Sequence, residues 1–405
     1  MATFFSQYNY ASEYQHRDML KIADGVTKER VLLMLMQRMG RITGPAGGDF
    51  CEWPVYMRNP KPKGFSPAAT PEYNAPDPFR VAALNWGSYQ HGLILDRITL
   101  QVNKGKEQLI NKYEHAKMEV ESSFKNRWPE YLYQDGGNPP LGEPYPVHGF
   151  YTWFKPIAST AAANQGYQGK VRLVSGSYAG LTMDLGTEGS DYSGPDGFST
   201  VQTTNAGTGV TAGQSWWPAG RGDPAFDYWH PLVVNSTANA WGPSPGFNEV
   251  YVSDMLDFAI SYSRRVASGD AGEVNLVLCA TDPYLTIKKH FATTYRTMAQ
   301  YLNDPMGQTT QGRAYSEPVY NFGGCALVRD YDIPNTTDLI GINMDTIQYK
   351  TVHPINTYSG TLPIMEPWNG MVPGGNGELL GGWTLGQMYV YTPRNTFLIT
   401  PLGDA

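Results

Sequence analysis

The spacing of apolar residues predicts an α+β chain with one long helix. From residue 103 to 128 apolar positions recur every three or four residues, as on one face of a helix. The stripe consists of Leu109, Tyr113, Ala116, Val120, Phe124 and Trp128. Asn103 is a candidate N-cap, and Pro129 is expected to end the helix. At ~1.5 Å per residue this helix is ~39 Å long, which is typical of a structural beam.

A strict alternation precedes this helix and predicts a strand. Apolar side chains at Cys51, Trp53, Val55 and Met57 share one face, and Pro54 restricts the strand to a sheet edge. Six prolines follow within residues 59–78, too many for a helix or a ladder. A second strand-like run starts at Phe79 and continues irregularly to Leu100. The simplest geometry is a long two-stranded excursion with a stiff tip.

The rest of the pattern mixes short helices, strands and loops. It predicts helices over residues 26–39, 248–265 and 283–302 and strands over residues 273–280, 318–328 and 388–402, the last interrupted at Pro393. Gly40 is expected to stop the first helix. The glycines within residues 374–382 lack the lysine and helix of a phosphate cradle and are expected to form a flexible loop. Residues 185–225 have no periodicity and are interpreted as an insertion.

Composition narrows the functional class. With 44 Gly, 30 Pro and 17% charged residues in 405, the chain is loop-rich and globular rather than disordered or coiled coil. A net charge of −7 argues against binding nucleic acid by neutralising phosphates. The charge is uneven: residues 1–130 hold 17 Lys and Arg against 14 Asp and Glu, whereas residues 131–405 hold 13 against 23. The first part is therefore basic and the second acidic.

The sequence carries no motif typical of catalysis or of a bound cofactor. HExxH, GxxxxGK[ST], GxSxG and GxGxxG are all absent, and no two of the seven histidines are spaced as a helical metal pair. Asp330 and Asp332 beside Pro334 are interpreted as turn residues. Three cysteines without CxxC spacing indicate a reducing compartment. We predict no enzyme activity, no catalytic residue, no cofactor and no metal, and we see neither a signal peptide nor a membrane span.

The order of several segments along the chain resembles the major capsid proteins of tailed bacteriophages, which share the Hong Kong 97 fold with herpesviruses. An arm, the excursion and the long helix come first. The remaining pieces are a Gly-rich turn at 134–142, His148–Phe154, the pair Ser177–Leu181 and Tyr228–Pro231, the strand Asn275–Pro283 between two helices, and Val319–Asp330. The resemblance covers nearly the whole chain.

This resemblance implies a Hong Kong 97-type α+β fold with peripheral and axial domains. The expected segments are an N-terminal arm (1–49), an extended two-stranded loop (50–100), the spine helix with the first part of the peripheral domain and the 185–225 insertion (101–240), an axial domain (241–345) and a C-terminal return to the peripheral domain (346–405). The implied function is self-assembly, through hexamers and pentamers, into the icosahedral head that encloses double-stranded DNA. The arm is too short to contain a scaffolding segment, so a separate scaffolding protein is expected.

The resemblance also implies partners, a location and contact residues. A portal protein and decoration proteins are further expected partners, no membrane is involved, and the protein is expected in the virion after assembly in the host cytoplasm. The expected intersubunit contacts are Trp53, Lys61, Lys63, Phe65, Phe79 and Trp86. In some relatives a loop lysine forms an isopeptide bond with an asparagine of a neighbour, which here would join Lys61 or Lys63 to Asn356 or Asn395.

Two other classes stay open. Trp216, Trp217, Tyr228 and Trp229 would suit a β-rich carbohydrate-binding protein, secreted or cytosolic, because aromatic faces stack on sugars, although such residues are more often core. An intracellular metal-dependent enzyme rests only on the dispersed histidines and is the weaker alternative.

Overall fold

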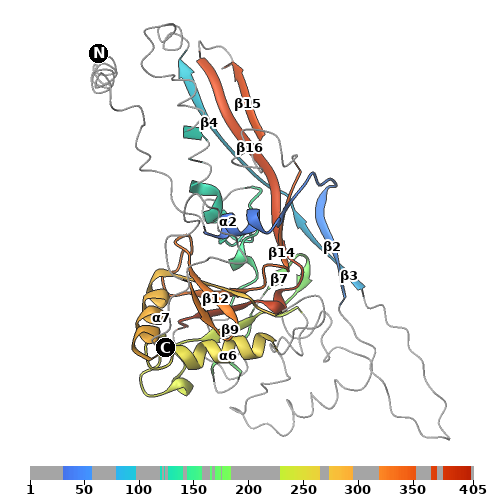
Figure 1. The fold of residues 1–405 in the computed structure, drawn as a ribbon. Helices are drawn as coiled ribbons and strands as arrows, with labels where there is room; N and C mark the ends of the chain where they lie inside the picture. The colour runs from blue at the N-terminus through green and yellow to red at the C-terminus, as the bar shows by residue number, and fades with distance from the viewer. Residues whose placement is uncertain are drawn as a thin grey trace, which may run out of the picture.

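The computed structural model describes residues 31–56, 79–96, 119–120, 123, 126–139, 144–156, 165–166, 169–174, 176–183, 229–264, 273–294, 319–352, 366–371 and 377–402. Within these residues the chain forms a compact body, a long sheet that projects from it, and a two-stranded ribbon at its side (Figure 1). Helices and strands are mixed, as the sequence predicts.

An eight-stranded sheet forms the centre of the body. Its order is β11 (Tyr320–Phe322), β12 (Cys325–Arg329), β10 (Leu276–Cys279), β13 (Leu339–Ile342), β17 (Phe397–Thr400), β9 (Leu232–Asn235), β6 (Val171–Arg172) and β5 (Gln165–Gly166). Every residue of β9, β10, β13 and β17 is buried. Strands that are covered on both faces have continuous apolar sequences rather than alternating ones. The apolar run within residues 273–280 predicted such a strand, and β10 confirms it.

Two helices cover one face of this sheet. These are α6 (Val252–Arg264) and α7 (Thr281–Thr294), which lie along the body in Figure 1. Val277 and Cys279 of β10 pack against this helical layer, whereas Leu276 and Leu278 point to the opposite face and join the main core. The body is therefore layered, with a smaller core under the helices and a larger one behind the sheet.

The segment predicted as one strand over residues 318–328 is a hairpin instead. β11 and β12 pair in antiparallel fashion around Gly323 and Gly324, whose φ values are +58° and +84°. Two consecutive residues with positive φ are what a tight two-residue hairpin turn requires, and glycine adopts them without strain. The single-strand prediction was wrong because the Gly-Gly pair marks a chain reversal.

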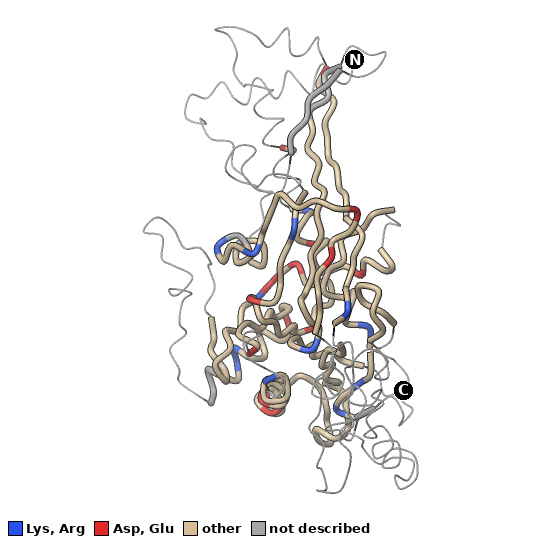
Figure 2. The backbone as a smooth tube through the Cα atoms, turned by 90° about the vertical axis from the view of Figure 1, so that its right-hand side faces the viewer, with Lys and Arg blue, Asp and Glu red and all other residues tan. Residues whose placement is uncertain are grey.

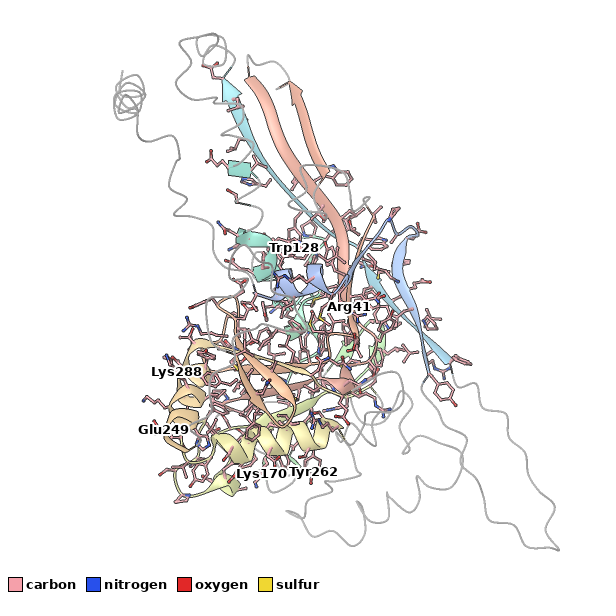
Figure 3. All side chains as sticks on the ribbon, viewed as in Figure 1. Arg41, Trp128, Lys170, Glu249, Tyr262 and Lys288 are labelled. Atoms are coloured by element: carbon pink, nitrogen blue, oxygen red, sulfur yellow. The ribbon has the colours of Figure 1, made fainter. Side chains whose placement is uncertain are left out.

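The projecting sheet is built around β16 (Gly377–Val390). It pairs with β4 (Gly87–Asp96) over residues 377–386, with β15 (Glu366–Met371) over 378–383, and with β14 (Ile347–Thr351) over 386–390. β14 also receives β1 (Ile42–Thr43) as a parallel strand. Few charged residues lie on the long strands (Figure 2).

This sheet corrects two predictions. Gly377, Gly381 and Gly382 belong to β16 and not to a flexible loop, because Gly381 and Gly382 pair with β4 and β15 on both sides and Gly377 pairs with β4. The predicted two-stranded excursion does not continue to residue 100 as one unit, because β4 leaves it to join β16. The predicted excursion is confirmed nearer its base, where β2 (Phe50–Tyr56) pairs with β3 (Phe79–Asn85), and Pro54 lies on an edge strand as expected.

The first described helix, α2 (Val31–Arg38), lies in the main core. Val31, Leu32, Leu35 and Met36 are fully or almost fully buried in their own chain. The part of the predicted N-terminal arm (1–49) that forms α2 therefore packs into the core, whereas residues 47–49 are exposed. Gly40 follows the helix with a φ of +64°, which confirms the predicted stop.

The long helix predicted over residues 103–128 lies mostly outside the described residues. Its described end runs as helix through residues 126–131, so Pro129 does not terminate it. Trp128 packs edge-on against Tyr349 with ring centroids 4.9 Å apart, and Leu132 just beyond is fully buried. We attribute the continuation past the proline to this packing, which outweighs the local preference.

The predicted domain boundaries stay a prediction. The eight-stranded sheet takes strands from three of the predicted segments, since β5, β6 and β9 precede residue 241 and β17 follows residue 346. A division of the body into domains therefore has to group strands by the sheet they form, even where they are distant in the sequence.

Asp330 connects separate parts of the main core. Its Oδ2 accepts hydrogen bonds from the Tyr133 hydroxyl at 2.7 Å and from the backbone N–H of Leu32 in the first turn of α2 at 3.3 Å. Its Oδ1 accepts the N–H of Asp332 at 2.9 Å, which confirms the predicted turn role. A buried carboxylate at a helix N-terminus satisfies otherwise unpaired donors and favours the helix dipole.

We expect Asp330→Ala to lower the free energy of unfolding by about 3 kcal/mol or more, because it leaves buried donors on Tyr133 and Leu32 without an acceptor. Urea unfolding of dispersed subunits would measure this. Asp257→Ala, at an exposed position of α6, is the control and should change the value by less than about 0.5 kcal/mol. Equal effects of the two substitutions would contradict the role of Asp330.

Candidate functional site

The β2–β3 ribbon has one buried and one exposed face. Cys51, Trp53 and Val55 of β2 point inward with Ala82 and Leu84 of β3. The alternation is complete over β2, so every second residue faces outward. A two-stranded ribbon is marginal in water without such packing, and the buried face therefore fixes the ribbon to the body.

Trp53 is the main anchor of the buried face. Its ring lies 4.7 Å from that of Tyr389 and 6.3 Å from that of Tyr178, and its Nε1 donates a hydrogen bond to the Tyr391 carbonyl at 3.2 Å. The side chain has an exposed fraction of 3%, because residues of its own subunit cover it. Its predicted contact with a neighbour stays a prediction, although little of the indole is accessible to one.

A tight turn holds the base of the ribbon. β7 (Ser177–Tyr178) and β8 (Leu181–Thr182) form a short hairpin in which Ala179 has a φ of +53° and Gly180 a φ of +79°. The Ala179 carbonyl accepts the backbone N–H of Ala83 in β3 at 3.1 Å. A left-handed conformation is unfavourable for alanine by roughly 1 kcal/mol, so the surrounding contacts hold this turn in place.

The outward face of the ribbon is mostly apolar, and Glu52 is the charged residue on it. Phe50, Tyr56, Phe79 and Val81 are exposed by 48%, 51%, 58% and 61%, and Pro54 lies among them. Tyr56 and Phe79 are cross-strand partners whose rings pack edge-on at 5.5 Å. Several large apolar side chains on one surface of a projecting element are typical of a protein interaction site.

The other predicted contact residues have different positions. Trp86 follows β3, is half-buried, and donates from its Nε1 to the Gly48 carbonyl at 2.9 Å. Lys61, Lys63 and Phe65 lie outside the described residues. None of these intersubunit contacts is tested by a single chain, and they stay predictions. The sequence analysis did not include Phe50, Tyr56 and Val81 among the contacts, although their alternation with the buried residues of both strands could have indicated them.

The suggested cross-link partners also differ. Asn356 lies outside the described residues. Asn395, in the short helix η5 (Pro393–Asn395), has an exposed fraction of 2%. An amide buried to this extent is not accessible to a lysine of another subunit, so Asn395 does not suit an isopeptide bond in this conformation.

The aromatic residues considered for sugar binding do not form a platform where they are described. Trp229 is 1% exposed, and its Nε1 donates to the Tyr178 carbonyl at 3.1 Å. This residue is core, as the more frequent interpretation held. Trp216, Trp217 and Tyr228 lie outside the described residues.

His230, next to Trp229, is neutral and structural. Its Nε2 accepts the backbone N–H of Val174 at 2.9 Å, so the proton lies on Nδ1, which donates to the Pro231 carbonyl at 2.6 Å. Burial lowers the pKa of His230 to about 4, and it likewise lowers the pKa of His148 to about 4. Among the described residues, no group of three His, Cys, Asp or Glu side chains is placed to hold a metal.

We expect Trp53→Ala to lower the free energy of unfolding by about 3 to 5 kcal/mol, because it leaves a cavity between the ribbon and the body. Phe79→Ala should change it by less than about 1 kcal/mol, since that side chain is mostly exposed. Urea unfolding of dispersed subunits measures both. A large loss from Phe79→Ala would show that the outward face is packed within the subunit.

Stability should fall as the pH drops from about 6.5 toward 4. An unfolded histidine takes up a proton near pH 6.5, which folded His230 does not accept until about pH 4. At pH 5 this difference lowers the free energy of unfolding by about 2 kcal/mol. His230→Gln should therefore lose about 2 kcal/mol less than the wild type between pH 8 and pH 5 in urea unfolding. An identical pH dependence would contradict this assignment.

Comparisons with known proteins identify the fold. No family model and no curated protein matches the sequence. No described helix is long and apolar enough to cross a membrane. Among solved structures, the chain is similar to the capsid asymmetric unit of cyanophage A-1(L), with a TM-score of 0.56, 11% identity, and coverage of 94% of this chain and 95% of that one. It is also similar to the capsid of an empty GTA particle, with a TM-score of 0.50, 10% identity, and coverage of 96% and 95%. The chain has the fold of tailed-phage major capsid proteins.

Proposed function

We propose that this chain is a major capsid protein that self-assembles, through hexamers and pentamers, into an icosahedral shell around double-stranded DNA. The observation that carries the proposal is the likeness to phage capsid subunits over 94% of the chain. A shell subunit acts by repeating the same contacts and needs no catalytic residue. The Hong Kong 97-type division into spine, peripheral and axial parts belongs to this proposal.

The ribbon provides an assembly surface in this proposal. Its buried face holds it on its own subunit through Trp53, while Phe79 and Val81 present apolar surface outward. Stable obligate interfaces bury about 2,000 Å² or more, and a projecting element lets each subunit reach a neighbour. Phe79 and the loop residues Lys61, Lys63 and Phe65 are the contacts we assign to it.

The charge asymmetry fits contacts between unlike surfaces. The basic part, residues 1–130, would lie over the acidic part, residues 131–405, of adjacent subunits. Opposite potentials raise association rates and suppress wrong orientations. An acidic total also suits a container that releases its DNA, since a strongly basic wall would bind phosphates.

The partners follow from the proposed function. They are further copies of the chain, a separate scaffolding protein, a portal protein and decoration proteins, with assembly in the host cytoplasm and a final place in the virion. The DNA is enclosed without sequence-specific binding. Uniform closed shells formed by this chain expressed alone would contradict the need for separate scaffolding.

The direct test is negative-stain electron microscopy with light scattering on the purified chain, alone and with lysate of infected cells. Shells, hexamers, pentamers or tubes are expected. A 45 kDa monomer at high concentration in both conditions would contradict the proposal. A glycan-binding screen would then test the carbohydrate-binding alternative.

We expect Phe79→Glu to slow assembly at least about tenfold, because a charge on the apolar face must be desolvated at the contact. Phe79→Tyr, which keeps the ring, is the matched control and should assemble within about twofold of the wild-type rate. Light scattering measures both rates. Normal assembly of Phe79→Glu would exclude this side chain from the contact.

The assembly rate should also fall as salt increases from low to physiological ionic strength, because screening weakens the attraction between basic and acidic surfaces. Stopped-flow light scattering at constant protein concentration measures this. A rate independent of salt would remove the electrostatic part of the proposal.

A further inference from the structure

The two outer edges of the ribbon differ. In an antiparallel pair, successive residues turn their N–H and C=O alternately toward the partner strand and toward the outer edge. Ala83 donates its N–H to Ala179 in the body, so it faces the outer edge of β3. Ala83 pairs with Glu52, and two residues along the ladder Val81 pairs with Pro54. All four residues therefore face outer edges.

The outer edge of β2 is blocked at Pro54. A proline has no N–H, and at this position the missing donor would have pointed outward, so no bond between β2 and β3 is lost. Glu52 places a charge on the same edge and is exposed. Proline and charge are the usual features that prevent another strand from pairing with an edge.

Among the described residues, the outer edge of β3 is covered at its base and has no partner strand further out. Ala179 occupies the edge at Ala83. At Val81 the N–H and C=O point outward, the side chain is 61% exposed, and among the described strands only β2 pairs with β3. An apolar residue with outward backbone groups beside Pro54 is a favourable start for strand pairing.

We propose that the β3 edge at Val81 accepts an extended segment of a second copy of this chain, and that the β2 edge does not. This inference rests on the proposed shell function, which places copies side by side. The outward face beside this edge, with Phe79 and Tyr56, is apolar, so the added strand carries apolar side chains on the same face. Backbone hydrogen bonds then fix the same register between β3 and the added strand at every contact between copies.

Two proline substitutions test the edge. Val81→Pro and Glu52→Pro each remove one outward N–H and leave the ladder bonds between β2 and β3 in place. We expect Val81→Pro to slow assembly about tenfold or more, the effect of one lost hydrogen bond per contact. Glu52→Pro should stay within about twofold of wild type, and Val81→Thr, which keeps the N–H, should do the same. Tryptophan fluorescence, to which Trp53 contributes together with other buried tryptophans, checks folding.

Hydrogen exchange on the wild-type chain gives a second measurement that needs no variant. On assembly the Val81 amide should exchange at least about 100-fold more slowly, while the Glu52 amide is nearly unchanged. The Ala83 amide, already bonded to Ala179, is the internal reference and should be protected before and after assembly.

The outcomes separate the inference from the function. If wild-type shells form and Val81→Pro forms them equally well, or if the Val81 amide stays unprotected in shells, the edge inference falls and the shell function stands. Equal loss from Val81→Pro and Glu52→Pro also overturns it. If the Val81 amide is protected only when a scaffolding or decoration protein is present, the segment that pairs with β3 does not come from a second copy of this chain, and the inference is wrong. If the wild type never assembles, both proposals fall.

Discussion

The packing of Trp53 against Tyr389 and Tyr178 determines which side chains of the ribbon are exposed on the surface of this chain. A ribbon of two strands is not stable alone in water, and this contact attaches it to the body. Because side chains alternate strictly along a strand, burying Trp53 turns Phe79 and Val81 outward. The interaction that stabilises the subunit therefore also creates its exposed apolar face.

The same region joins the main parts of the structure. The Tyr178 hydroxyl accepts the N–H of Val390 at the end of β16, and its carbonyl accepts the indole N–H of Trp229, which precedes β9. The next residue, Ala179, holds the ribbon through Ala83. Ribbon, projecting sheet and central sheet thus share one core. The ribbon is therefore connected to strands of both sheets.

The sequence predicts the elements whose signals are local. The alternation of β2 and the apolar run of β10 each depend on burial, which leaves a clear pattern. The glycine-rich start of β16 does not, because its strand character comes from pairing with β4, nearly 300 residues earlier in the chain. Local rules also identify the Asp330 turn but not its bond to Leu32. The hairpin at Gly323 was predictable, since Gly-Gly between apolar runs favours a two-residue turn.

The same reasoning explains how the fold is kept at 11% identity to the capsid protein of cyanophage A-1(L). Burial patterns and backbone ladders constrain the type of residue at a position and not its identity. In a shell made of one chain, as proposed, both sides of a contact are encoded by the same sequence. A substitution on the ribbon, and a compensating substitution on the surface that the ribbon contacts in a neighbouring copy, are then both present at every such contact in the shell. Backbone pairing at an edge such as β3 constrains side chains less than a contact between side chains, so it lets the surface sequence change while the register stays fixed.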